Sequence, residues 1–179
     1  MNMPVVNAAI PESDPTRTSQ PRGITTDRGT VRTLSKVLRH NDLMTALELI
    51  PLATVSVKRG EILRLGETPF SRRVIGSIAE GRWEGERLRG TIVGAGGDWA
   101  IPSAGNIMLL DVRQVIHTDD DALIYVTYKG RCDRERGTYT VAPTFETGDA
   151  RYDWLNAIQA VGQGRNEDDR IVYEMFEVR

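Results

Sequence analysis

Short apolar runs, separated by glycine or proline at close intervals, limit what this chain can fold into. From Leu47 onward apolar and polar residues alternate with a period of two, as at Val55 and Val57, which is typical of strands with one buried face. The runs are punctuated by Gly66, Pro69, Gly81, Gly85, Gly90, Gly105 and Gly130. This spacing favours a meander of antiparallel strands. Because closure removes exposed edges, we expect an all-β chain that forms a single antiparallel β-barrel.

The second half of the chain contains the clearest strand pair. Residues 107–117 and 123–129 alternate as strands, and the acidic segment 118–122 between them predicts a hairpin turn. Residues 171–178 alternate apolar and charged side chains, which predicts a final strand. The segment 151–160 is expected to open with a minor helical turn around Tyr152, Trp154 and Leu155.

The N-terminal part differs from the rest in composition. Residues 1–29 carry four prolines among many Ser, Thr and Arg residues, which predicts a flexible tail that cannot bury enough apolar surface to fold. In residues 30–45, apolar side chains recur at helical spacing and Thr30 can cap the first turn, which predicts a short helical extension. The β-barrel domain is expected to span residues 46–179.

Composition excludes several classes of protein. The formal net charge of -2 gives no excess field toward nucleic acid or an anionic membrane, so neither is expected as a partner. No apolar run approaches the ~20 residues needed to cross a bilayer. Cys132 is the only cysteine and no secretory signal is visible, so the expected location is cytoplasmic.

Motifs for cofactors and metals are missing. The glycines at 94–97 do not fit a phosphate-binding loop, because no lysine and no helical pattern follow them. His40 and His117 are the only histidines, too few for the usual zinc sites. The acidic run 119–121 is better explained as a solvated turn than as a calcium site. We therefore expect no cofactor and no metal.

Candidate chemistry lies on the strand that begins at Ile107. Alternation places Met108, Leu110, Val112 and Ile116 on one face and Asp111, Arg113 and His117 on the other. If the polar face lines the barrel lumen, Asp111 is a candidate general base and Arg113 can hold a ligand carboxylate, enolate or phenolate. The alternative is a structural ion pair or plain surface charge, and the sequence leaves both open.

A second candidate acid follows a run of glycines. The segment Gly94–Trp99 is expected to turn tightly at the barrel mouth and to present Asp98 as another possible base beside Trp99. The side chains expected to bind substrate are Trp99, His117, Tyr125, Tyr139 and Trp154.

Several short motifs resemble one family. They are Gly66–Pro69, Gly81–Gly85, Leu88–Gly90, Gly96–Trp99, Leu110–Arg113, Thr118–Asp120, Tyr139 with Pro143–Thr147, and Tyr152–Asn156, and in this order they resemble the Domain of Unknown Function 3237 family from about Leu47 onward. The resemblance implies a calycin-like barrel with a central cavity, assembled as a homodimer. It also implies that residues 96–99, 111–113 and 152–156 line the cavity. The chain departs from the family at Asp121, where glycine is usual, and at Ser71.

Two main hypotheses for function follow. The first is a cofactor-independent enzyme of the isomerase, lyase, hydratase or cyclase type, acting by acid–base chemistry on a small, partly apolar or aromatic metabolite. Asp111 or Asp98 would be the base and Arg113 the oxyanion partner. The alternative is a non-catalytic barrel that binds or carries such a molecule. A third hypothesis is an interaction protein that docks a partner through its helix and tail.

Overall fold

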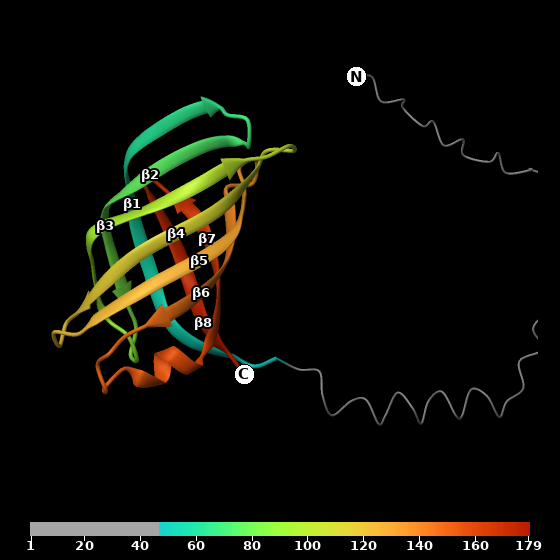
Figure 1. The fold of residues 1–179 in the computed structure, drawn as a ribbon. Coiled ribbons are helices and arrows are strands. Elements are labelled where there is room, and N and C mark those ends of the chain that lie inside the picture. Colours follow the sequence, from blue (N-terminus) through green and yellow to red (C-terminus); the bar gives the residue numbers. More distant parts are fainter. Residues whose placement is uncertain (1–46) are drawn as a thin grey trace, which may run out of the picture. The chain divides into compact units, whose positions relative to one another are not determined.

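Eight antiparallel strands close into one barrel in sequence order, with β1 pairing with β8 (Figure 1). The computed structural model describes residues 47–179. The strands are β1 (Leu49–Glu67), β2 (Arg72–Glu84), β3 (Gly90–Pro102), β4 (Ile107–Thr118), β5 (Leu123–Asp133), β6 (Thr138–Glu146), β7 (Gln159–Glu167) and β8 (Arg170–Val178). A short 3-10 helix, η1 (Asp153–Ala157), connects β6 to β7.

The predicted all-β class and single antiparallel barrel are confirmed, and the helical turn around Trp154 is present as η1. The predicted tail 1–29 and helical extension 30–45 lie outside the described residues, and so stay predictions. Within residues 47–179, η1 is the single helical element, and no helix has the length and apolarity needed to cross a membrane.

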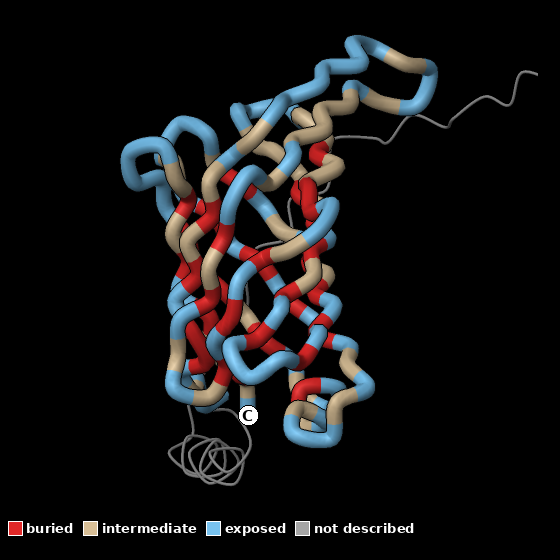
Figure 2. Tube along the Cα trace, turned by 90° about the vertical axis from the view of Figure 1, so that its left-hand side faces the viewer, coloured by how far each residue is buried: buried red, intermediate tan, exposed pale blue. Residues whose placement is uncertain are grey.

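The two ends of the barrel differ. The turns β1–β2, β3–β4, β5–β6 and β7–β8 lie together at one end, here called the open end, where the β1–β2 hairpin projects beyond the other strands (Figures 1 and 2). The opposite end, here called the closed end, carries η1. Leu155 of η1 is fully buried and belongs to the same core cluster as Trp83 and Phe145, whose rings meet edge to face at 5.9 Å. Packed side chains therefore fill the closed end.

Period-two alternation decides which side chains point into the barrel. On β5, Ile124, Val126 and Tyr128 are buried, whereas Tyr125 between them is 39% exposed. Each fully buried aliphatic side chain of this kind stabilises the fold by about 1.5–3 kcal/mol. The inward face of the strands is thus set by the core, and the same face continues toward the open end.

The expected glycine turn at residues 94–99 is wrong, because this segment lies inside β3 and not in a loop at the barrel mouth. The pairing of β3 with β4 shifts register between Val93 and Gly97, and Gly94 has a φ of 69°. This geometry is that of a bulge, which glycine permits without ending the strand. Regular pairing with β4 resumes at Gly97 and continues to Pro102.

Candidate functional site

A cavity of about 790 Å³ occupies the barrel from its middle to the open end. That volume lies within the roughly 300–1,000 Å³ common for small-molecule sites. Its wall is largely apolar, with side chains such as Met108, Leu110 and Val112 of β4 and Ile171 of β8. Polar side chains, among them Asp98, Asn166 and several arginines, also line this wall, so the cavity can enclose an apolar body and orient it through polar contacts.

Asp98 is the single carboxylate among the described residues that line the cavity. Oδ1 of Asp98 accepts a hydrogen bond of 2.9 Å from the backbone N–H of Asp111. Oδ2 has no hydrogen bond to another described residue. Burial raises the pKa of Asp98 above its ordinary value, against the lowering effect of the Asp111 N–H. The site therefore holds a carboxylate that is a stronger base than one in water.

Three tyrosines line the same cavity. The ring centroids of Tyr128 and Tyr173 are 6.3 Å apart and those of Tyr139 and Tyr173 are 5.7 Å apart, and both pairs pack edge to face. Burial raises the pKa of Tyr128 and Tyr173, and the charge of Asp98 adds to this effect. At neutral pH these phenols keep their protons and can donate hydrogen bonds.

A glycine makes room for Tyr173. A Cβ atom at Gly164 of β7 would lie 2.5 Å from Cδ1 of the Tyr173 ring, closer than two such atoms approach. Gly164 and Tyr173 are opposite one another in the β7–β8 ladder. The missing side chain thus lets the Tyr173 ring lie against the β7 backbone.

A polar chain runs from the cavity wall to the open end. Oδ1 of Asn166 accepts hydrogen bonds of 2.9 Å from both Tyr139 Oη and Arg59 Nη2. Burial raises the pKa of Tyr139 to about 12. Burial also raises the pKa of the neighbouring Cys132 thiol, which keeps it protonated and poorly nucleophilic at neutral pH.

Asp111 and Arg113 lie on the outer face of β4, because Leu110 and Val112 on either side of Asp111 line the cavity. Arg113 Nη2 is 3.4 Å from Asp111 Oδ1, and its guanidinium lies 5.1 Å from the ring centroid of Trp99. Trp99 also points outward, since Asp98 and Ala100 are the inward residues at this point of β3. These three residues form a surface cluster outside the lumen.

The other predicted binding residues are dispersed. His117 is on the outer face near the closed end, with Nε2 2.7 Å from Asp121 Oδ1, and Tyr125 is on the outer face of β5. Trp154 belongs to η1 and stacks under the Arg87 guanidinium at 4.2 Å. Of the predicted binding residues, the structure places Tyr139 on the cavity wall.

Sequence reasoning missed Tyr128, Tyr173 and Arg59. All three stand two residues beyond a buried apolar residue on the inward face: Tyr128 after Val126, Tyr173 after Ile171, and Arg59 after Val57. Extending each alternation by one step would have found them. The predicted Tyr125 is one residue out of phase with the inward face of β5.

Gln114 is a further unexpected polar group, 2% exposed on the inward face of β4. Neither atom of its amide has a partner among the described residues. It follows Val112 toward the closed end and so lies below the cavity-lining part of β4.

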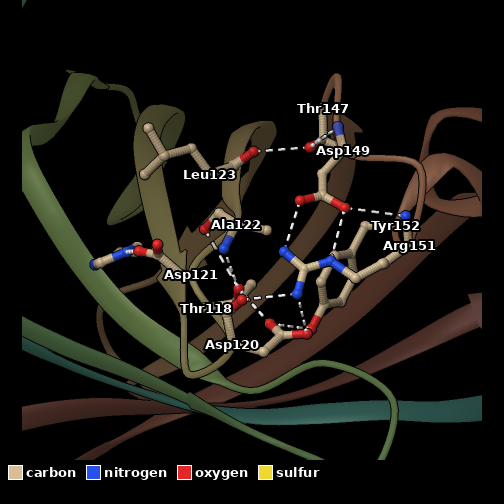
Figure 3. A network of polar contacts seen from close by, with 10 residues as sticks. Thr118, Asp120, Asp121, Ala122, Leu123, Thr147, Asp149, Arg151 and Tyr152 are labelled. Carbon is tan, nitrogen blue, oxygen red and sulfur yellow. Dashed lines mark hydrogen bonds and ion pairs between the residues drawn. The ribbon is translucent and has the colours of Figure 1, made fainter.

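The closed end is tied together by a polar network around the acidic turn (Figure 3). Arg151 donates to the backbone oxygen of Asp120 at 2.7 Å, to the Asp120 carboxylate at 3.1 Å and to the Asp149 carboxylate at 2.7 and 2.9 Å. Tyr152 Oη donates to the Asp120 carboxylate at 2.9 Å. The carboxylates are thus engaged by hydrogen-bond donors. Among residues 47–179, no group of three or more His, Cys, Asp or Glu is arranged to hold a metal ion.

The family model described as "Protein of unknown function (DUF3237)" matches residues 47–178. The chain belongs to this family. A relative within the curated proteins, a UPF0311 protein of Rhodopseudomonas palustris, is 26% identical over 148 residues, which cover 74% of this chain and 97% of that protein. The DUF3237 assignment agrees with the predicted resemblance and with the observed barrel.

Solved structures of similar proteins share the fold. A β-barrel-like protein from Acinetobacter baumannii is 28% identical with a TM-score of 0.67, covering 75% of this chain and 98% of that one. An enzyme from Penicillium herquei has a TM-score of 0.61 at 22% identity, covering 75% of this chain and 94% of that one. At that identity the likeness concerns the DUF3237 barrel fold alone.

Proposed function

We propose that the cavity holds a small, partly apolar or aromatic molecule and that Asp98 acts on it as a general base. The observation that carries this proposal is the Asp98 carboxylate itself: it lines the cavity, its Oδ2 has no hydrogen bond to a described residue, and burial raises its pKa. A carboxylate with a raised pKa is the usual general base of enzymes that move protons near neutral pH. Asp111 and Arg113, which face outward, have no part in this proposal.

The proposed step is a proton transfer at a carbon next to a carbonyl group. Asp98 takes the proton, the C–H bond breaks, and its electron pair moves to the carbonyl oxygen. A phenol of Tyr128 or Tyr173, protonated because its pKa is raised, donates a hydrogen bond to that oxygen. Return of the proton to another carbon gives isomerisation, and departure of an oxygen from the β-carbon of the enolate gives elimination. In the reverse direction, an oxygen adds to the β-carbon of an α,β-unsaturated carbonyl compound, and protonated Asp98 gives its proton to the α-carbon, which amounts to hydration or cyclisation.

Deuterium exchange into aromatic ketones tests the base without knowledge of the natural substrate. In D₂O, we expect the protein to catalyse exchange at the α-carbon of 2-tetralone or 1-indanone, followed by proton NMR. Asp98→Asn should lower the catalysed rate by about 100-fold or more, the usual contribution of a general base. Asp111→Asn is the matched control: its carboxylate points away from the lumen, and its charge is a lesser cause of the raised pKa of Asp98 than burial is, so this variant should keep most of the wild-type rate.

The alternative function is a barrel that binds or carries such molecules without chemistry. The largely apolar wall and the volume of the cavity favour binding whether or not a reaction follows. If Asp98→Asn and the wild-type protein exchange equally, the base assignment is wrong. Ligand binding that persists in both proteins would then identify a carrier.

A further inference from the structure

The arginines of the barrel fall into two groups. Arg59, Arg64, Arg73, Arg131 and Arg134 form no ion pair with a carboxylate among residues 47–179, whereas the others do. All of the unpaired group except Arg131 line the cavity. Arg72, which pairs weakly with Glu67 at 3.8 Å, also lines it. The cations left without an anion of the protein's own are thus concentrated at one site.

These guanidinium groups retain donors that no described residue uses. Arg59 donates one hydrogen bond, to Asn166, and Arg73 donates one of 2.8 Å, to the backbone oxygen of Trp99. Arg134 reaches Asn106 at 3.3 and 3.4 Å, and Arg64 has no hydrogen bond to a described residue. A guanidinium has five N–H donors, so most of them point to solvent or into the cavity mouth.

The charge of the cavity contrasts with that of the chain. The whole sequence has a net charge of -2, yet the cavity is lined by five arginines and by Asp98 as its single carboxylate. Like charges gathered at the rim of a low-dielectric hollow repel one another and focus a positive potential there. An anion at the rim would relieve this repulsion, and a planar carboxylate matches the paired donors of an arginine.

Three of the cavity arginines lie nearer the open end than the proposed base, whereas the half-buried Arg73 bonds the backbone oxygen of Trp99, next to Asp98. Along β3 the inward residues run from Pro102 at the open end through Ala100 to Asp98. Four residues of strand correspond to about 13 Å. Arg59, Arg64 and Arg134 are exposed, and belong to the open end of the cavity. A ligand with its anionic group at the rim would therefore place its apolar body along the tyrosines, beside Asp98.

We propose that the substrate or ligand of this barrel is an organic carboxylate with an apolar or aromatic body, bound head outward at the arginine rim. The rim is defined as Arg59, Arg64 and Arg134, the exposed cavity arginines that have no ion pair with a described residue. This inference rests on the proposed function for the place of the body, next to Asp98, but the rim itself makes a separate claim about charge.

Matched pairs of probes test the charge preference on the full-length chain. Isothermal titration compares 2-naphthoate with 2-naphthamide, and 4-phenylbutyrate with 4-phenylbutanamide, because each pair shares one apolar body. The carboxylate should bind at least about tenfold more tightly than its amide, as expected for a charge-assisted pair. The preference should shrink as salt is raised, since the rim is exposed.

Two variants locate the preference. In Arg64→Gln/Arg134→Gln, which alters exposed side chains outside the core, the carboxylate preference should fall by about tenfold while amide affinity stays unchanged. Arg131→Gln is the control, because this unpaired arginine does not line the cavity, and it should bind like the wild type. Equal affinity for acid and amide, no binding of either acid, or a preference that survives in the rim variant would overturn the proposal.

The preference for a carboxylate and the deuterium exchange that depends on Asp98 are measured independently, so either proposal can fail alone. A preference for the acid without Asp98-dependent exchange would support the arginine rim as an anion site and contradict the role of Asp98 as a base. Asp98-dependent exchange of neutral ketones without a preference for the acid would support Asp98 as the base and contradict the arginine rim as an anion site.

Discussion

At the scale of single residues, Asp98 is where stability and the proposed chemistry conflict. Its pKa is raised in the folded state, so the folded protein holds the proton more tightly than the unfolded chain does. Ionised Asp98 therefore destabilises the fold at neutral pH. This penalty disappears as pH falls below the ordinary Asp pKa, because the carboxyl is then protonated in both states.

Asp98→Asn should accordingly raise the melting temperature at pH 7. The amide oxygen can still accept the hydrogen bond from the Asp111 N–H, while the buried charge is gone. The gain over wild type should decrease as pH is lowered from 7 toward 3.5, and differential scanning fluorimetry across this range measures it.

Glu146→Gln is the control for that experiment, because Glu146 is exposed at the end of β6. It should change the melting temperature little at any pH. A loss of stability in Asp98→Asn at pH 7 would show that the ionised carboxylate stabilises the fold and would contradict a raised pKa.

At the scale of elements, the β4–β5 turn shows a residue held in an unfavourable conformation. Asp121 has a φ of 73°, in the left-handed region. Glycine adopts this conformation without strain, which explains why glycine is usual at this position in the family. Its side chain contacts His117 and is 91% exposed, so that contact contributes little. The network of Arg151, Asp120 and Thr118 holds the turn in place.

Asp121→Gly should stabilise the protein by about 0.5 kcal/mol. The left-handed conformation costs an L-residue roughly 1 kcal/mol, and the greater entropy of glycine in the unfolded chain offsets part of the gain. Urea unfolding followed by circular dichroism measures the free energy of unfolding. Asp119→Gly, which loses the paired 2.6 Å contacts with Arg82 and relieves no positive φ, should be destabilised instead. A destabilised Asp121→Gly would mean that the contact with His117 outweighs the backbone strain.

At the scale of the whole molecule, exposed apolar side chains gather on the β1–β2 hairpin. Leu63 and Leu65 are about half exposed and Phe70 is 97% exposed, and all three belong to the β1–β2 hairpin. This hairpin projects at the open end (Figure 2). Exposed apolar groups of this kind mark contact surfaces. The homodimer expected from the sequence stays a prediction, and this hairpin is the surface that we propose for it.

Leu63→Ser/Phe70→Ser should convert a dimer of the wild-type chain to a monomer. Size-exclusion chromatography with light scattering, at concentrations from about 1 to 100 µM, gives the mass directly. Leu123→Ser removes a comparably exposed leucine near the closed end and should leave the dimer intact. A wild-type protein that is monomeric throughout this range would contradict the homodimer, and a dimeric double variant would move the interface elsewhere.

The sequence by itself determined the class of the fold. Alternation with a period of two, frequent glycines and the lack of helical runs after Leu47 specify antiparallel strands, because these are local properties of neighbouring residues. The removal of exposed edges by closure predicted the barrel, and the ordered family motifs predicted its central cavity. The helical turn at Trp154 and the β4–β5 hairpin were also predicted correctly.

Only the tertiary structure decided which face of each strand is the lumen. On β4, alternation separated Asp111 and Arg113 from Leu110 and Val112, but both assignments satisfy the same local pattern. The choice depends on barrel closure, which buries the apolar face. Barrel closure also brings Asp98 of β3, Tyr128 of β5 and Tyr173 of β8 together in one cavity. It places Arg59 and Arg134 at the open end of the same cavity. Residues so distant in sequence meet only through the register of the closed sheet, and no local pattern encodes that register.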